Sequence, residues 1–244
     1  MPRFFSPAFA GKAAGDTVAL TPADSAHARR SLRMNIGDAL DLCDEQGHDL
    51  AAHIDAFDGD LVLARIDAVC DSHSEPHTRV TLYQGLPKGD KLEQIIQKTV
   101  ELGVAEIVPV EMSRSIAKIG DKGDKKLARF QKIADEAAGQ SERGIKPAVA
   151  APLSFKEAVA KIKNSGGKTL VCYERGGVPI KTVLSPADTA VSLVIGPEGG
   201  IAPEELLALK KAGAVAVTLG PRILRTETAP LAALAVVMDR TDNM

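Results

Sequence analysis

The order of hydrophobic and polar positions changes once along this chain, near residue 76. Before that point, apolar residues gather in short runs at 39–44, 50–57 and 61–70, separated by the turn-rich stretches DEQGHD and DGD. Runs of this length, bounded by Gly and Asp, are typical of β-strands. Strands that are so short and so close together predict a small β-barrel.

A short helix is expected among these strands, in the stretch TPADSAHARRSLRM. Thr21 suits its N-cap, Pro22 its first helical position and Asp24 its first turn. Further along, the polar segment Asp71–His77 contains a proline and has no apolar periodicity. We place the domain boundary in this segment, which predicts one domain at 1–72 and a second at 77–244.

The second part alternates apolar runs with amphipathic segments, whose apolar residues recur every three or four positions. Strands are expected in 79–86, 105–112, 168–174, 190–195 and 214–219, and helices in 89–103, 124–140, 154–164, 202–213 and 225–240. Asp90 with Glu93, and Ser154 with Glu157, have the spacing of a capping box. Strands that alternate with helices predict an α/β fold with a mainly parallel sheet.

Composition agrees with a globular protein and argues against a membrane protein. Of 244 residues, 45% are hydrophobic and 25% are charged, and the longest apolar run, APLAALAVVM, is too short to span a bilayer. We therefore expect a cytoplasmic location. The three cysteines are far apart and the five histidines lack metal-ligand spacing, so we expect buried free thiols and no metal.

Charge is distributed unevenly. The formal net charge is -2, but residues 1–76 carry 6 basic against 13 acidic side chains, and residues 77–244 carry 24 against 19. The most basic stretch, 112–132, contains seven basic residues, Arg114, Lys118, Lys122, Lys125, Lys126, Arg129 and Lys132, against Asp121 and Asp124. Such a stretch is either a phosphate-binding surface or a solvated helix face.

Two glycine-containing loops follow apolar runs of the second part. The first, VIGPEGGI at 194–201, places three glycines and a proline around Glu198. Ligands of parallel sheets lie beyond the carboxyl ends of the strands, where glycines let backbone amides approach them. A tight turn without a ligand is the alternative. A G-x-G-x-x-G motif is absent, and SGGKT has Ile162 where a phosphate loop needs its first glycine.

The second loop, LGPRILRTETAPLAAL at 219–234, repeats the Gly-Pro pair and adds a dense polar cluster. Thr226 or Thr228 could cap the helix that follows, and Glu227 would suit its dipole. Capping does not require two arginines, Arg222 and Arg225, in the same loop. The loop therefore predicts a binding site.

Several segments resemble one known family. The motifs of the RsmE family of ribosomal RNA methyltransferases, which belong to the SPOUT class, resemble five segments of this chain: LVIGPEGGI, LGPRILRTETA, KGDKLEQIIQKTVELGV, GQSERG and HARRSLRMNIGD. The resemblance covers nearly the whole chain. It implies a C-terminal SPOUT domain with a trefoil knot, a small N-terminal PUA-like β-barrel that binds RNA, and S-adenosylmethionine as cofactor.

The resemblance also implies the sites. Three loops, 171–177, 195–200 and 219–228, would hold the cofactor, through Tyr173, Glu174, Ile195, Gly196, Glu198, Gly199, Gly200, Leu219, Gly220, Leu224, Thr226 and Thr228. Arg225 and Glu227 are the catalytic candidates. RNA-binding candidates are Arg3, Arg29, Arg30, Arg33, Lys125, Lys126, Arg143 and Arg222. The family forms homodimers, and the segment APLAALAVVM is apolar or small at every position, which favours a partner surface.

The implied reaction is methylation of uracil N3 in 16S ribosomal RNA, the RNA of the small subunit. The N3 proton must leave, and Glu227 would accept it or position the base, while Arg225 would stabilise charge on an oxygen. Alternatively, these two side chains only pair with each other and water takes the proton. Ribose 2′-O methylation by another SPOUT enzyme and a non-catalytic RNA-binding assembly factor remain alternative functions. A doubly wound phosphosugar or nucleotide enzyme would need a different phosphate loop.

Overall fold

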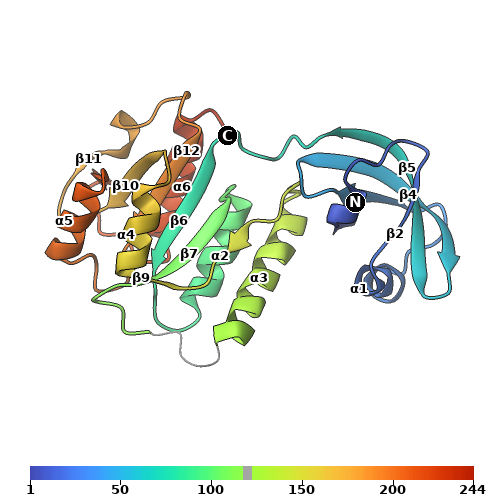
Figure 1. Cartoon of the computed structure of the whole chain (residues 1–244), viewed down its shortest axis with the longest axis horizontal. Helices are drawn as coiled ribbons and strands as arrows, with labels where there is room; N and C mark the ends of the chain where they lie inside the picture. The colour runs from blue at the N-terminus through green and yellow to red at the C-terminus, as the bar shows by residue number, and fades with distance from the viewer. Residues whose placement is uncertain (118–122) are drawn as a thin grey trace. The chain divides into compact units, whose positions relative to one another are not determined.

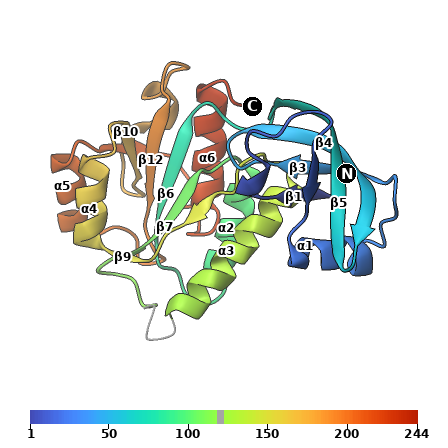
Figure 2. The same ribbon diagram turned by 45° about the vertical axis from the view of Figure 1, so that its right-hand side comes forward.

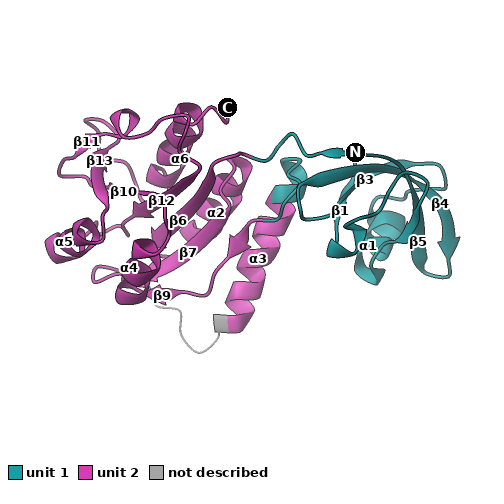
Figure 3. Ribbon diagram, turned by 45° about the horizontal axis from the view of Figure 1, so that its top comes forward, with its two compact units in different colours: residues 1–75, 138–146 teal, residues 76–137, 147–244 magenta. Residues whose placement is uncertain are grey.

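The computed structural model describes residues 1–117 and 123–244, which form two compact units (Figure 3). The first unit comprises Met1–Glu75 and Ala138–Lys146, and the second comprises Pro76–Ala137 and Pro147–Met244. None of the helices in the described residues is long and apolar enough to pass through a bilayer.

The segment Ala138–Lys146 belongs to the first unit, although the sequence analysis assigned it to the second domain. The carboxylate of Glu75 explains this placement. Its oxygens accept hydrogen bonds from Arg143 Nη2 at 2.7 Å and from the Gly144 and Ile145 amides, each at 3.0 Å. These bonds join residues about seventy positions apart, so no local sequence pattern announces them.

The first unit contains a five-stranded sheet in the order β1-β3-β4-β5-β2. Its strands are β1 (Arg3–Phe5), β2 (Thr17–Ala19), β3 (Ala39–Cys43), β4 (His48–Asp58) and β5 (Leu61–Asp71). Neighbours pair antiparallel except β1 and β3, which are parallel. The three longer strands are those expected from the sequence, whereas β1 and β2 are too short to give a pattern. Alternate apolar residues of β3, β4 and β5, such as Leu42, Ile54 and Ile66, form its core.

Short helices complete the first unit. These are η1 (Pro7–Phe9), α1 (Pro22–Ala26) and the π-helical turn η2 (His27–Ser31). The expected cap of α1 is confirmed, since Thr21 Oγ1 accepts a hydrogen bond from the Asp24 amide at 3.1 Å.

The expectation that the cysteines are buried free thiols is wrong in part, because Cys43 is buried but Cys70 is exposed.

The second unit contains a parallel sheet in the order β11-β13-β10-β12-β6-β7-β8, with the short β9 pairing with β7 (Figure 1). Its strands are β6 (Arg79–Gly85), β7 (Glu106–Glu111), β8 (Ala148–Val149), β9 (Leu153–Ser154), β10 (Lys168–Cys172), β11 (Val178–Pro179), β12 (Ala190–Ile195) and β13 (Val215–Thr218). All their pairings are parallel, which confirms the α/β fold with a parallel sheet.

Helices cover both faces of this sheet, α2 and α6 on one side and α4 and α5 on the other (Figure 2). The helices are α2 (Lys91–Glu101), α3 (Gly123–Gln140), α4 (Phe155–Lys163), α5 (Pro203–Lys211) and α6 (Ala229–Arg240), with the 3-10 turn η3 (Ile180–Thr182). Because strand side chains alternate between the faces, Tyr83, Val108 and Val194 pack towards α4 and α5 in one core.

One of the two expected capping boxes forms. Ser154 and Glu157 bond reciprocally at the start of α4, as predicted. Asp90 makes no side-chain cap bond at the start of α2, so that prediction is wrong. Glu93 instead accepts a hydrogen bond from Arg129 of α3 at 2.7 Å, a tertiary contact that competes with local capping.

At the carboxyl ends of the central strands, the chain that leaves β12 passes very close to the end of β6. β12 lies beside β6, with Ile195 opposite Gln84, so the chain leaving β12 passes next to Gly85. A Cβ atom on Gly85 would lie 2.6 Å from Pro197 Cδ and from Pro197 N. Only glycine permits this approach, which brings the loop after β12 over the edge of the sheet.

Candidate active site

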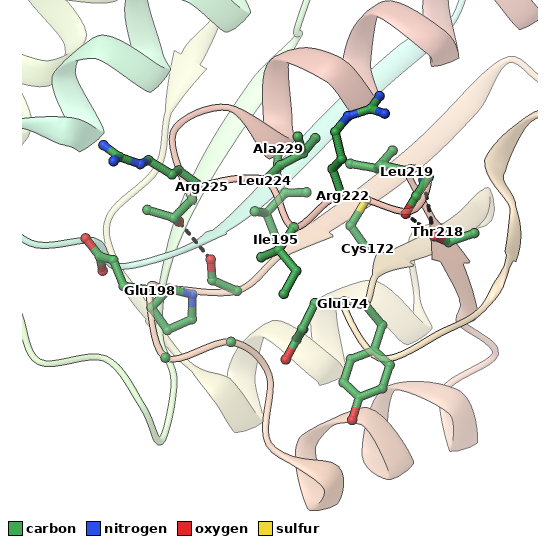
Figure 4. Close-up of a pocket in the computed structure, with 18 of the residues that line it drawn as sticks. Cys172, Glu174, Ile195, Glu198, Thr218, Leu219, Arg222, Leu224, Arg225 and Ala229 are labelled. Carbon is green, nitrogen blue, oxygen red and sulfur yellow. Dashed lines mark hydrogen bonds between the residues drawn. The ribbon is translucent and has the colours of Figure 1, made fainter.

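Three loops meet at this edge and enclose a cavity of about 560 Å³ (Figure 4). They follow β10, β12 and β13, the strands after which the sequence analysis expected them. Every residue assigned to the cofactor lines this cavity except Thr228, which occupies the N-cap position of α6. Of the two catalytic candidates, Arg225 lines the cavity and Glu227 lies beside it, in contact with the lining residue Lys91.

Glycines bring the loops into close contact. Gly200 has a φ of +70°, and a Cβ atom there would lie 2.5 Å from Glu174 Oε1 of the loop after β10. A Cβ atom on Gly199 would lie 2.8 Å from Arg114 Cβ. The composition of GPEGG is therefore required by the packing of three chain segments around one space.

A buried hydrogen-bond network joins the loops after β12 and β13. Gln84 Nε2 of β6 donates to Thr226 Oγ1 at 3.1 Å, and this hydroxyl donates to the Gly196 carbonyl at 2.8 Å. Gln84 is fully buried and Thr226 nearly so. Thr226 and Thr228 were the candidate caps of α6, but neither hydroxyl caps this helix. Thr226 instead connects two loops about thirty residues apart.

The segment after β7 fastens the loop from outside. Arg114 Nη1 donates to the Gly199 carbonyl at 2.9 Å, and Glu205 of α5 accepts from the Ser113 amide at 2.8 Å and from the Ala202 amide at 3.0 Å. Arg114 belongs to the basic stretch 112–132, and its bond to Gly199 shows that it also holds the GPEGG loop in place.

A cluster of charges lies at the cavity, centred on Lys91 in the first turn of α2. Lys91 Nζ is 3.1 Å from Glu198 Oε1 and 3.1 Å from Glu227 Oε2, and Arg225 Nη1 is 4.0 Å from Glu227 Oε1. Lys91 was not among the expected site residues. It belongs to the quoted KGDK motif, but this motif forms the start of a helix that is far from both loops in the sequence.

These groups hold one another in their charged forms. The neighbouring carboxylates of Glu227 and Glu198 raise the pKa of Lys91. The pKa of Glu227 is lowered by its own backbone amide, then by Lys91 and Arg225. Burial raises the pKa of Glu198, but the backbone amides of Glu198 and Lys88 and the Lys91 ammonium outweigh it and lower the pKa. At neutral pH the cluster therefore contains two carboxylates, one ammonium and one guanidinium.

Comparison with known proteins identifies the family. Residues 73–238 match the family model described as an RNA methyltransferase domain. The chain is 36% identical over 234 residues to ribosomal RNA small subunit methyltransferase E of Bacillus subtilis strain 168, which covers 93% of this chain and 91% of the relative. The chain belongs to the ribosomal RNA small subunit methyltransferase E family. The homologue from Synechocystis is 37% identical over 226 residues, covering 91% of this chain and 72% of the relative.

A solved member of the family has the same fold over its whole length. The crystal structure of ribosomal RNA small subunit methyltransferase E from Neisseria gonorrhoeae, bound to S-adenosylmethionine, superposes with a TM-score of 0.87 at 33% identity. The match covers 98% of this chain and 97% of that chain. The family named from sequence motifs is thus confirmed by sequence and by structure.

Two of the arginines expected to bind RNA are paired inside the first unit, where Arg143 is buried and Arg3 is half-buried. Arg143, 4% exposed, forms its ion pair with Glu75, and Arg3 donates to Asp49 Oδ1 at 2.8 Å and to the Arg143 carbonyl at 3.3 Å. A guanidinium paired inside a unit is not free to bind phosphate. Both side chains instead attach residues 138–146 to the rest of the first unit.

The other RNA-binding candidates remain accessible. Arg30, Arg33, Lys125, Lys126 and Arg222 are exposed, and Arg29 is half-buried, stacked over the Phe57 ring at 4.9 Å. Lys118 and Lys122 lie outside the described residues. No group of His, Cys, Asp and Glu in residues 1–117 and 123–244 could hold a metal ion.

Proposed function

We propose that this protein transfers the methyl group of S-adenosylmethionine to N3 of a uridine in 16S ribosomal RNA. The observation that carries the proposal is the single cavity formed by the three glycine-containing loops, with the charge cluster of Lys91, Glu227 and Arg225 beside it. The names of the relatives support the RNA, and the cofactor bound to the Neisseria protein supports the methyl donor.

The cavity fits such a cofactor. Its volume of about 560 Å³ lies within the usual range for small-molecule sites. Ile195, Leu219, Leu224 and Ala229 offer an apolar surface for an adenine ring, and the glycines leave backbone groups open to its polar atoms. Side chains of both charges line the same space, as a ligand with an ammonium, a carboxylate and a sulfonium requires. When bound, the cofactor supplies an electrophilic methyl group.

The catalytic candidates suit a reaction at an N–H group. Uracil N3 carries a proton that is committed to base pairing in a duplex, so the base must be unpaired when it enters the site. Glu227 is ionised at neutral pH, and it can accept or orient the N3 proton. The Arg225 side chain is 85% exposed, so its guanidinium is free to contact an oxygen of the base. Water remains the alternative acceptor of the proton.

The finer architecture belongs to the same proposal. We infer a trefoil knot in the second unit and a PUA-like, RNA-binding barrel in the first. Membership of the family and the parallel strand order support the knot, and the five-stranded sheet supports the barrel.

We also infer a homodimer that uses α6. Ala233, Leu234, Val237 and Met238 of this helix are buried, whereas Leu231, Ala232, Ala235 and Val236 are only half-buried. The half-buried residues form an apolar stripe along the helix, which a second copy of the chain would cover.

The function is tested by mapping methylated nucleosides in the small-subunit ribosomal RNA of cells that lack this protein. We expect one N3-methyluridine to disappear and to return with the wild-type gene, but not with a Glu227→Ala, Arg225→Ala variant. Nuclease digestion distinguishes base methylation from ribose 2′-O methylation. An unchanged set of modified nucleosides would favour a non-catalytic assembly factor and would contradict the proposal.

A further inference from the structure

Lys91 occupies an unusual position for a lysine. It is the first residue of α2, where the helix dipole repels a cation. Leu92, Ile95 and Ile96 of the same helix are buried, so the backbone at Lys91 is fixed. Two carboxylates, Glu198 and Glu227, offset the repulsion, and each comes from a different loop of the cavity. An ammonium that lies beside the cavity despite the unfavourable helix dipole indicates a chemical role.

Two carboxylates neighbour the Lys91 ammonium among the described residues, so at least one of its N–H groups is left for another partner. An ammonium has three N–H donors. Lys91 Nζ forms ion pairs with two carboxylate oxygens, Glu198 Oε1 and Glu227 Oε2, both at 3.1 Å, and Lys91 itself lines the cavity. Glu227 Oε2 has no aligned hydrogen-bond donor among the described residues, so neither carboxylate takes up more than one of the three N–H groups. The third donor is therefore available to a ligand in the cavity, and the two carboxylates restrict where it can point.

We propose that Lys91 is a catalytic residue, whose third N–H group binds a carbonyl oxygen of the uracil ring and stabilises the negative charge that this oxygen gains when the N3 proton leaves. The inference rests on the proposed N3 methylation and adds a residue that the sequence motifs did not assign.

The charge cluster is complementary to the N3 edge of uracil. That edge presents a carbonyl oxygen, an N–H group and a second carbonyl oxygen. The cluster presents the Lys91 ammonium, the Glu227 carboxylate and the Arg225 guanidinium, with Lys91 at Oε2 of Glu227 and Arg225 at Oε1. Donors therefore face acceptors at all three positions. Cytosine would place its amino group, a donor, against one of the two cations, so the same cluster selects uracil.

The step balances as follows. The N3 proton passes to the Glu227 carboxylate and from there to water, and the electron pair of the N–H bond forms the new bond from N3 to the methyl carbon. The carbon–sulfur bond breaks and its electrons remain on sulfur. Charge that spreads from N3 onto the ring oxygen during this step is held by Lys91 and disappears when the methyl group is in place. Because Glu227 and Glu198 keep Lys91 protonated, it donates a hydrogen bond and does not act as the base.

Single-turnover methylation tests this role, with small ribosomal subunits from cells lacking the protein and a saturating concentration of S-adenosylmethionine. We expect Lys91→Met to lower the rate by about 10²- to 10³-fold, as for the loss of one preorganised donor to a developing oxyanion. The dissociation constant of S-adenosylmethionine, measured by calorimetry, should change less than about threefold, far below the loss in rate. Lys91→Arg should retain part of the rate, because a guanidinium still donates. Lys98→Met is the matched control, since Lys98 is on the same helix and pairs only with its neighbour Glu101 among the described residues.

Two results would overturn the inference. A Lys91→Met rate within about threefold of the wild-type rate would remove Lys91 from the chemistry. A large loss of cofactor affinity with a normal rate at saturation would make Lys91 a cofactor contact instead. If Lys91→Met fails to fold in a thermal melt, Lys91→Gln is compared with Lys91→Arg, since both donate hydrogen bonds but only Arg is charged. Equal rates for these two variants would then overturn the role of the positive charge. If the wild-type protein produces no N3-methyluridine, the proposed function fails, whatever the variants show.

Discussion

Thr226 gives the sharpest test of how the cavity is held together. Thr226→Val preserves the shape of the side chain and removes the hydroxyl that joins Gln84 Nε2 to the Gly196 carbonyl. No other donor to this carbonyl is found among the described residues, and Gln84 Oε1 already lacks a partner there. Leaving buried polar groups unpaired costs about 1–3 kcal/mol. We therefore expect a loss of stability in this range.

The same loss should reduce cofactor affinity. Gly196 and Thr226 both line the cavity. If the contact between their two loops is loosened, part of the binding free energy of the cofactor must be used to bring the loops together again. Each ~1.4 kcal/mol corresponds to a tenfold change in affinity, so the dissociation constant of S-adenosylmethionine should rise by at most roughly 5- to 150-fold. Urea unfolding gives the free energy of unfolding, and calorimetry gives the dissociation constant.

Thr99→Val is the matched control. Thr99 is fully buried in α2, and its hydroxyl donates to the Ile95 carbonyl at 2.7 Å. That carbonyl lies inside the helix, where it also accepts a backbone amide, so removing the hydroxyl leaves no carbonyl unpaired. We expect a loss below about 1 kcal/mol and unchanged cofactor binding. If the two variants unfold and bind alike, the network does not hold the loops and the reasoning is refuted.

Two further predictions concern partners. Reversing Lys125 and Lys126 to Glu should weaken RNA binding and should make the slope of log affinity against log salt concentration shallower by roughly 1.5–2. Reversing Lys210 and Lys211 at the end of α5 should leave that slope unchanged. If the Lys125, Lys126 variant has the wild-type slope, these two residues belong to a solvated helix face. Light scattering should give a mass of about 51 kDa, twice the 25.6 kDa of one chain. Val236→Glu in α6 should lower this mass, whereas Leu207→Glu on the exposed side of α5 should leave it unchanged. A mass near 25.6 kDa at every micromolar concentration, with full activity, would contradict the dimer.

Local interactions explain what the sequence could predict of this fold. Apolar periodicity located the longer strands and the helices, because a strand or helix that faces a core repeats its apolar residues with its own period. The Ser154 capping box and the Thr21 cap were found for the same reason, since each involves residues three positions apart. Short motifs pointed to two of the three loops, because glycines and a dense polar cluster stand at the ends of parallel strands, where ligands bind. The third loop, 171–177, came from the resemblance to the family alone.

Tertiary structure decided how the loops work together. Thr226 serves Gly196 and Gln84 rather than its own helix, Glu93 pairs with Arg129 rather than capping α2, and Arg143 is buried against Glu75 rather than exposed to RNA. Lys91 joins Glu198 and Glu227 across more than a hundred positions. A charged or polar side chain takes whichever partner the packed chain brings within about 3 Å. The sequence by itself therefore determined the elements and the residue types of the site, and only the fold determined which of those residues meet.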